Sequence, residues 1–202
     1  MGIKERRSVE KSEMKKRIRE AAIELIAQEG YEKLSIRKIA NKIEYSPTTI
    51  YLYYKDKAEI ITDMSDHLYS KVMSDITTTL NMTATVSLEK RVHEIMYKFV
   101  KGLSSEPEMI KAIMNSGIDV IFANESTVGV PSNPGIIMFN HFLEEGINKK
   151  VFRPSTRNNS WMIISAMLGF IMSAIGSQLY LLDNFDQLVH DFVQLLLGGI
   201  KQ

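Results

Sequence analysis

Apolar residues recur every three or four positions along almost the whole chain of 202 residues, and no convincing alternating pattern of a β-strand interrupts them. This spacing places apolar side chains on one face of a helix, so it predicts an all-α protein. The first amphipathic segment starts at Met14 and stops at Gly30, a natural residue just past a helix end. Apolar residues make up 45% of the chain, which is ample material for a core.

Two short helices joined by a tight turn are predicted next. Ser35 can cap the first of them, and Ser46, followed by Pro47 at the first helical position, can cap the second. Such a pair has the dimensions of a helix-turn-helix, in which the second helix lies in the major groove of DNA. We therefore expect a recognition helix at about residues 46–52.

Longer helices are predicted in the rest of the chain. Asp56 and Ser87 can cap two of them, and Pro107 can open a third. A fourth contains Ile137 as its first apolar position, and the last two start at Asn158 and Asp186. The helix that follows Asp56 should run to about Leu80, and the last two to about Leu182 and Leu197.

Charge is divided unevenly along the chain. Residues 1–57 hold 14 Lys+Arg against 9 Asp+Glu, whereas residues 58–202 hold 11 against 15. A basic N-terminal quarter suggests contact with a polyanion, although the same charges also fit solvated helix faces.

The stretch YSPTTIYLYYKDK, which starts at Tyr45 and ends at Lys57, contains four of the eight tyrosines. A phenol can donate a hydrogen bond to a phosphate oxygen while its ring packs on sugar or a thymine methyl, and Thr48 and Thr49 offer hydroxyl groups beside it. Lys57 can reach a phosphate directly. The alternative is ordinary packing of these rings between helices.

A longer string of residues passes through the same region without a gap. It consists of Gly30-Tyr31, residues 35–40, Ser46, residues 49–51, residues 55–57 and Ile60-Ile61. This string resembles the N-terminal signature of the TetR-type (tetracycline repressor family) transcriptional regulators. Residues 142–155, FLEEGINKKVFRPS, are similar to the family's segment before its last two helices. The chain departs from many relatives at Glu44-Tyr45, where they have Gly-Val.

The resemblance implies two domains. Residues 1–57 would form a three-helix, helix-turn-helix DNA-binding domain, and residues 58–202 a helical domain for effector binding and dimerisation. The residues it implies at double-stranded DNA are Ser35, Arg37, Pro47, Thr48, Thr49, Tyr51, Tyr53 and Lys57. Among them Thr49, Tyr53 and Lys57 would contact phosphates, whereas Tyr54 is expected in the core.

The 22 residues from Trp161 to Leu182 carry no charge and are long enough to span a membrane. No Lys/Arg cluster flanks the run and Gln178 lies within it, so we favour burial in protein over a membrane-associated helical protein. A helix that is apolar on every side must be buried on every side, which predicts a homodimer. The expected interface residues are Ser165, Gly169, Ser173, Leu188, Phe192 and Leu195.

The resemblance also implies a small-molecule effector that releases a repressor from a pseudo-palindromic operator. The candidate wall residues are Met73, Met96, Phe99, Met114, Phe122, Met138 and Phe142. Few charges lie among them, so an apolar or cationic organic effector is expected, and no cofactor.

An enzyme is the rival class. His141 stands at helical spacing from Glu144 and Glu145 and would suit a metal, and Ser8 with Lys11 matches the spacing of a serine hydrolase-type enzyme. Cysteine is absent, which excludes disulfides and Cys-ligated metals. The first residues have neither an apolar signal segment nor a lipidation motif, so we expect a cytoplasmic protein.

Overall fold

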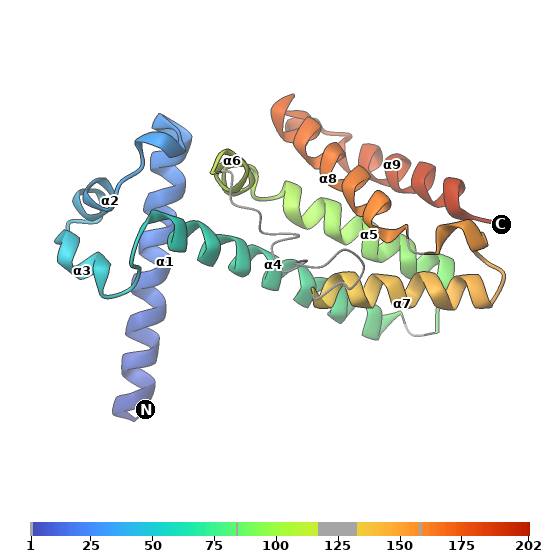
Figure 1. The fold of residues 1–202 in the computed structure, drawn as a ribbon, viewed down its shortest axis with the longest axis horizontal. Coiled ribbons are helices and arrows are strands. Elements are labelled where there is room, and N and C mark those ends of the chain that lie inside the picture. The colour runs from blue at the N-terminus through green and yellow to red at the C-terminus, as the bar shows by residue number, and fades with distance from the viewer. Residues whose placement is uncertain (1, 84, 117–132, 158) are drawn as a thin grey trace. The chain divides into compact units, whose positions relative to one another are not determined.

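The computed structural model describes residues 2–83, 85–116, 133–157 and 159–202 (Figure 1). Its α-helices are α1 (Ile3–Glu29), α2 (Ile36–Lys42), α3 (Pro47–Tyr51), α4 (Lys57–Met82), α5 (Leu88–Ser104), α6 (Pro107–Asn115), α7 (Pro134–Asn148), α8 (Ser160–Gly176) and α9 (Phe185–Ile200). Short 3-10 turns η1 (Tyr31–Lys33), η2 (Pro154–Thr156) and η3 (Leu179–Leu181) join some of them. Within the described ranges the β-structure amounts to one isolated bridge, between Phe152 and Lys201. The predicted all-α fold is confirmed.

Two predicted helix bounds were wrong. The first helix starts at Ile3 rather than Met14, because a helix needs no apolar stripe where Lys, Arg and Glu, all good helix formers, succeed one another. The helix expected to reach Leu182 ends at Gly176, where Gln178 turns the chain with a φ of 56°. Its expected start, Asn158, lies outside the described residues.

The chain divides into two compact units. The first comprises Met1–His67 with Pro107–Val120, and so holds α1, α2, α3, α6 and the start of α4. Its core is aliphatic, and Ile18, Ile39, Ile50 and Ile60 are all 0% exposed. The helix α6 packs against α1 within this unit. The functional boundary predicted between residues 57 and 58 stays a prediction.

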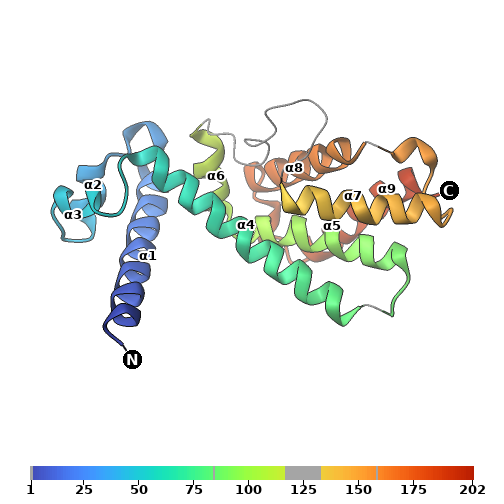
Figure 2. The same cartoon turned by 60° about the horizontal axis from the view of Figure 1, so that its bottom comes forward.

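The second unit comprises Leu68–Glu106 and Ile121–Gln202. Its helix α5 lies beside α7, α8 and α9, as Figure 2 shows. Val92, Met96 and Val189 are fully buried at these contacts. Among the helices that the structure describes, none combines the length and the apolar character needed to cross a membrane.

Candidate DNA-binding interface

Local capping fixes both short helices of the first unit. Ser35 Oγ accepts a hydrogen bond of 3.3 Å from the backbone N–H of Lys38, and Ser46 Oγ accepts one of 3.1 Å from that of Thr49. Pro47 occupies the first turn of α3, where no N–H is needed. The two helices pack against each other, so a helix-turn-helix forms where the sequence predicted it.

The turn between α2 and α3 is a Schellman motif with glutamate in the position that usually holds glycine. Glu44 has a φ of 60°, in the left-handed region. The N–H of Tyr45 donates to the carbonyl of Ala40 at 2.9 Å, and that of Glu44 donates to Asn41 at 3.3 Å. The tight turn is therefore built without a glycine at this position.

The recognition helix α3 presents one face to the core and the other to solvent. Ile50 is fully buried, whereas Thr48 is exposed and Tyr51 is 58% exposed. Pro47, Thr49 and Tyr53, which were also predicted at DNA, are partly exposed. These side chains share one small surface that remains open in the single chain.

An apolar side chain also stands at this surface and was not among the predicted contacts. Leu52, which caps the end of α3, is 76% exposed. Leu52 lies between Tyr51 and Tyr53 in the tyrosine-rich stretch, and that position is the sequence feature that indicates it. An exposed leucine at a recognition helix suits contact with a thymine methyl.

The other predicted DNA residues lie outside α3, and they differ in whether their side chains already make contacts within the chain. Arg37 is exposed on α2. Ser35 is occupied as a helix cap. Lys57 Nζ donates to the carbonyl of Tyr31 at 3.3 Å and lies 4.2 Å from the centre of the Tyr31 ring. Lys57 therefore has a structural contact in addition to its predicted phosphate contact.

Arg17 supports the turn, and the sequence patterns did not point to it. Its guanidinium lies 5.1 Å from the centre of the Tyr45 ring and donates to the Tyr45 hydroxyl at 3.3 Å. The two residues are 28 positions apart, so no local motif links them. This contact positions the ring of Tyr45 at the turn between α2 and α3.

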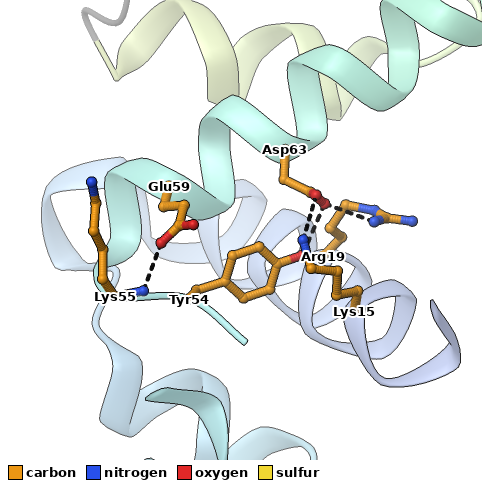
Figure 3. A network of polar contacts seen from close by, with 6 residues as sticks. All are labelled: Lys15, Arg19, Tyr54, Lys55, Glu59 and Asp63. Atoms are coloured by element: carbon orange, nitrogen blue, oxygen red, sulfur yellow. Dashed lines mark hydrogen bonds and ion pairs between the residues drawn. The ribbon is translucent and has the colours of Figure 1, made fainter. Parts of the chain in front are cut away.

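Asp63 of α4 joins three parts of the first unit (Figure 3). Its carboxylate accepts hydrogen bonds from Lys15 Nζ at 2.9 Å, Arg19 Nη1 at 2.7 Å and Tyr54 Oη at 2.8 Å. Burial raises the pKa of Asp63, but these three donors together hold that pKa below its ordinary value. Tyr54 is 1% exposed, which confirms its expected place in the core, and burial together with the Asp63 bond raises its pKa.

The residues predicted at a dimer interface lie on α8 and α9. Ser165, Gly169 and Ser173 are exposed on α8, and a Cβ placed on Gly169 would meet no atom within 4 Å. On α9, Leu195 is 74% exposed, and the Phe192 ring stacks 4.2 Å from Phe170 with part of its surface open. Leu188 of α9 is also partly exposed. The predicted interface is thus a surface on the single chain.

The predicted effector residues are divided between the two units, and their role stays a prediction. In the second unit, Met96 and Phe142 are buried, and Met73, Phe99 and Met138 are partly exposed. Met114 belongs to α6 of the first unit and is 41% exposed, and Phe122 lies outside the described residues. A small cavity in the second unit is lined by other residues, namely Asn140, Leu143, Glu144, Thr156 and Arg157.

The candidate residues for an enzymatic site either form ion pairs with other residues or are exposed. Glu144 accepts from Arg157 Nε at 3.1 Å, and Glu145 accepts from Lys149 at 2.7 Å. Ser8 and its partner Lys11 are exposed on α1. Among the described residues, no three His, Asp or Glu side chains are grouped so that they could hold a metal ion.

Comparisons of sequence point to one family for the N-terminal part. Residues 18–64 match the model of bacterial regulatory proteins of the tetR family. The chain is 33% identical over 64 residues to YuxN, an HTH-type transcriptional regulator of Bacillus subtilis, in a match that covers 32% of this chain and 22% of that protein. It is 32% identical over 66 residues to an HTH-type transcriptional regulator of Haemophilus influenzae, with 33% of this chain and 35% of that protein covered. The match spans well under half the length of either relative.

Comparisons of structure cover nearly the whole chain. The fatty acid degradation regulator FadR from Bacillus halodurans has a TM-score of 0.73 at 21% identity, with 92% of this chain and 95% of that one covered. A TetR-family transcriptional regulator from Haemophilus influenzae has a TM-score of 0.67 at 15% identity, with 95% and 98% covered. These likenesses show a shared fold. Residues 18–64, which hold the helix-turn-helix, thus match the tetR family of bacterial regulatory proteins, and the described chain shares the fold of the solved TetR-family regulator.

Proposed function

We propose that the chain is a DNA-binding transcriptional regulator that reads an operator with α3. The observation that carries this proposal is the exposed face of α3, where Thr48 and Tyr51 stand free on a helix that Ser46 caps and Ile50 anchors. Hydroxyl and phenol groups at this place suit hydrogen bonds to base edges and phosphates. Arg37, exposed on α2, adds a donor that suits guanine.

The test uses the DNA that lies next to the chain's own gene. We expect purified protein to bind a fragment of it that contains a pseudo-palindrome, in preference to the same fragment with the palindrome scrambled. Arg37→Ala should relax base preference by about 1 to 3 kcal/mol at particular positions. The slope of log affinity against log salt should change by no more than about one unit. Equal binding to both fragments by the unaltered protein would remove the basis of the proposal.

Lys57 offers a separate test of positioning on the phosphate backbone. Lys57→Ala should weaken binding to all duplexes and lower the slope of log affinity against log salt by about one unit for each protomer, or about two units for the dimer. The change also removes the contact with Tyr31, so the unfolding free energy of the variant must be measured beside its DNA affinity. An unchanged salt slope would mean that Lys57 serves the fold alone.

The proposed regulator acts as a homodimer joined by α8 and α9. The exposed faces of these helices, which include Gly169 and Leu195, support this arrangement. Twofold symmetry would set two recognition helices on successive major grooves, about 34 to 36 Å apart, and would explain a pseudo-palindromic operator.

The proposed effector is a small organic molecule bound by the second unit, and its binding releases a repressor from DNA. Met96 and Phe142 of this unit would contribute apolar walls. Arg91 places its guanidinium 4.8 Å from the centre of the Phe142 ring, which favours an apolar effector over a cationic one. A reporter gene under the operator should be silent with the intact regulator and active when the regulator is deleted.

Linkage supplies the test of the effector's role. A compound that releases the protein from DNA must bind the free protein more tightly than the DNA-bound protein, typically by about 1 to 3 kcal/mol. A compound found by its thermal stabilisation of the protein should therefore bind less tightly when the operator is present. Equal affinity for both states would leave no free energy for release.

A further inference from the structure

The N-terminal half of α1 carries a row of positive charge. Lys4, Arg7, Lys11 and Lys15 follow one another at steps of three or four residues, so they share one face of the helix and are called here the α1 basic stripe. Three residues further along the same face comes Ile18, which is fully buried. The face that packs into the first unit is therefore continued toward the N-terminus by positive charge.

The opposite charges of this segment lie on its other faces. Glu5, Glu10 and Glu13 are all off the α1 basic stripe, and Glu10 pairs with Arg6 at 3.2 Å. Within the described part of the chain, the first three side chains of the stripe are exposed and make no hydrogen bond or ion pair. A helix face that is merely solvated needs no such separation of sign, so the stripe favours an anionic partner.

The fourth member of the stripe shows where it meets the folded unit. Lys15 Nζ lies 2.9 Å from Asp63 Oδ1 and 4.7 Å from the centre of the Tyr54 ring. Tyr54 closely follows the end of α3 at Tyr51. In Figure 1 the N-terminal half of α1 extends past the pair α2 and α3. The stripe thus leaves the unit on the side where the chain comes out of the recognition helix.

We infer that the α1 basic stripe binds the phosphate backbone of duplex DNA that flanks the base pairs read by α3. This inference rests on the proposed function. From Lys4 to Lys15 the helix rises by about 16 Å, which is the length of about five base pairs. Val9, an exposed apolar side chain of this segment, lies off the stripe, so the stripe suits a polyanion better than an apolar helix.

Two matched double variants test the inference. Arg7→Ala with Lys11→Ala removes one arginine and one lysine from the stripe. Arg6→Ala with Lys16→Ala removes the same two residue types from other faces, where they pair with Glu10 at 3.2 Å and Glu20 at 3.7 Å. Both variants change net charge equally, and alanine preserves the helix. Circular dichroism should confirm that both are as helical as the unaltered protein.

Each protein is titrated, at several salt concentrations, with a duplex selected from random sequence by the unaltered protein. One form of this duplex ends with the selected site, and the other extends it by about 10 bp on each side. On the extended duplex, Arg7→Ala with Lys11→Ala removes two phosphate contacts from each protomer and should lower the slope of log affinity against log salt by about four units for the dimer, while the control double variant changes it by less than about one unit. On the short duplex the two variants should behave alike.

Equal slopes for the two double variants on the extended duplex would overturn the inference while leaving the proposed function intact. So would an equal loss on both duplexes, because the stripe would then not reach flanking DNA. Failure of the unaltered protein to select any duplex would instead overturn the proposed function, and the inference with it. The three outcomes are distinguishable in one set of titrations.

Discussion

The hydroxyl of Tyr54 donates a hydrogen bond of 2.8 Å to the carboxylate of Asp63. Through this bond, the segment that leaves the recognition helix is fastened to α4. The same carboxylate holds Lys15 and Arg19 of α1, so a single side chain connects α1, α4 and the segment that follows α3.

Replacing Asp63 should therefore destabilise the first unit. Asp63→Asn leaves two cations without their anion and should lower the unfolding free energy by about 1.5 to 3 kcal/mol, whereas Tyr54→Phe should cost about 1 kcal/mol. Urea denaturation measures both. Asp66→Asn, an exposed carboxylate on the same helix, is the control and should stay within about 0.5 kcal/mol of the unaltered protein.

The same variant has a pH signature. Because the pKa of Asp63 is lowered in the folded state, its carboxylate stabilises the fold above the unfolded pKa, for which 3.8 is the ordinary value, and this contribution is lost as the pH falls below that value. The stability difference between the unaltered protein and Asp63→Asn should thus shrink on acidification. A difference that stays constant from about pH 7 to about pH 3 would contradict the role given to Asp63.

Glu44 should be replaceable by glycine with a gain in stability. Its φ of 60° costs an L-residue about 1 to 2 kcal/mol, part of which the greater freedom of glycine in the unfolded chain offsets. We expect Glu44→Gly to raise the unfolding free energy by about 0.5 to 1 kcal/mol in urea denaturation. Glu44→Ala, which keeps the Cβ, should show no such gain, and Lys150→Gly, at a φ of 58° after α7, should repeat it.

The features that the sequence predicted correctly are those set by residues close together in the chain. The caps Ser35, Ser46 and Ser87 were found because their hydrogen bonds reach only three residues ahead. The start of α1 was missed because its first residues are mostly charged or polar and so give no apolar periodicity. The Asp63 contacts were missed because Lys15 lies 48 positions away along the chain, and no periodic pattern spans such a distance.

Gly146 of α7 should tolerate no side chain. A Cβ at this position would lie 2.1 Å from the ring of Phe152, which is fully buried. Gly146→Ala should therefore lower the unfolding free energy by about 1 to 3 kcal/mol through overpacking. Phe152→Leu in the same background should recover part of the loss, and strict additivity of the two changes in a double-mutant cycle would refute the proposed clash.

The α8 surface offers a test of dimerisation. Gly169→Leu or Ser173→Leu places a large side chain where two chains are proposed to meet, at a cost of about 1 to 3 kcal/mol, and should shift dimer toward monomer. Sedimentation of the purified variants measures this shift. Thr77→Leu, an exposed position on α4, should leave the assembly unchanged. An unaltered protein that sediments as a monomer at every concentration would contradict the proposed interface.

The recognition surface was predictable only in part. Thr48 and Tyr51 were placed at DNA from the signature, and both are exposed on α3. Leu52 and Arg17 were not placed there. Leu52 was missed because apolar periodicity marks only the buried face of a helix, and the contact of Arg17 with Tyr45 depends on how α1 packs against the turn.

The central claim, that α3 reads DNA sequence, is tested most directly by fluorescence anisotropy with the selected duplex and a scrambled duplex of equal composition. The unaltered protein should prefer the selected duplex, and Thr48→Ala should reduce this preference by about 1 to 3 kcal/mol while leaving the salt slope unchanged. If Thr48→Ala kept the full preference while Arg37→Ala and Tyr51→Ala also kept it, the recognition surface assigned to α3 and its neighbour α2 would be wrong.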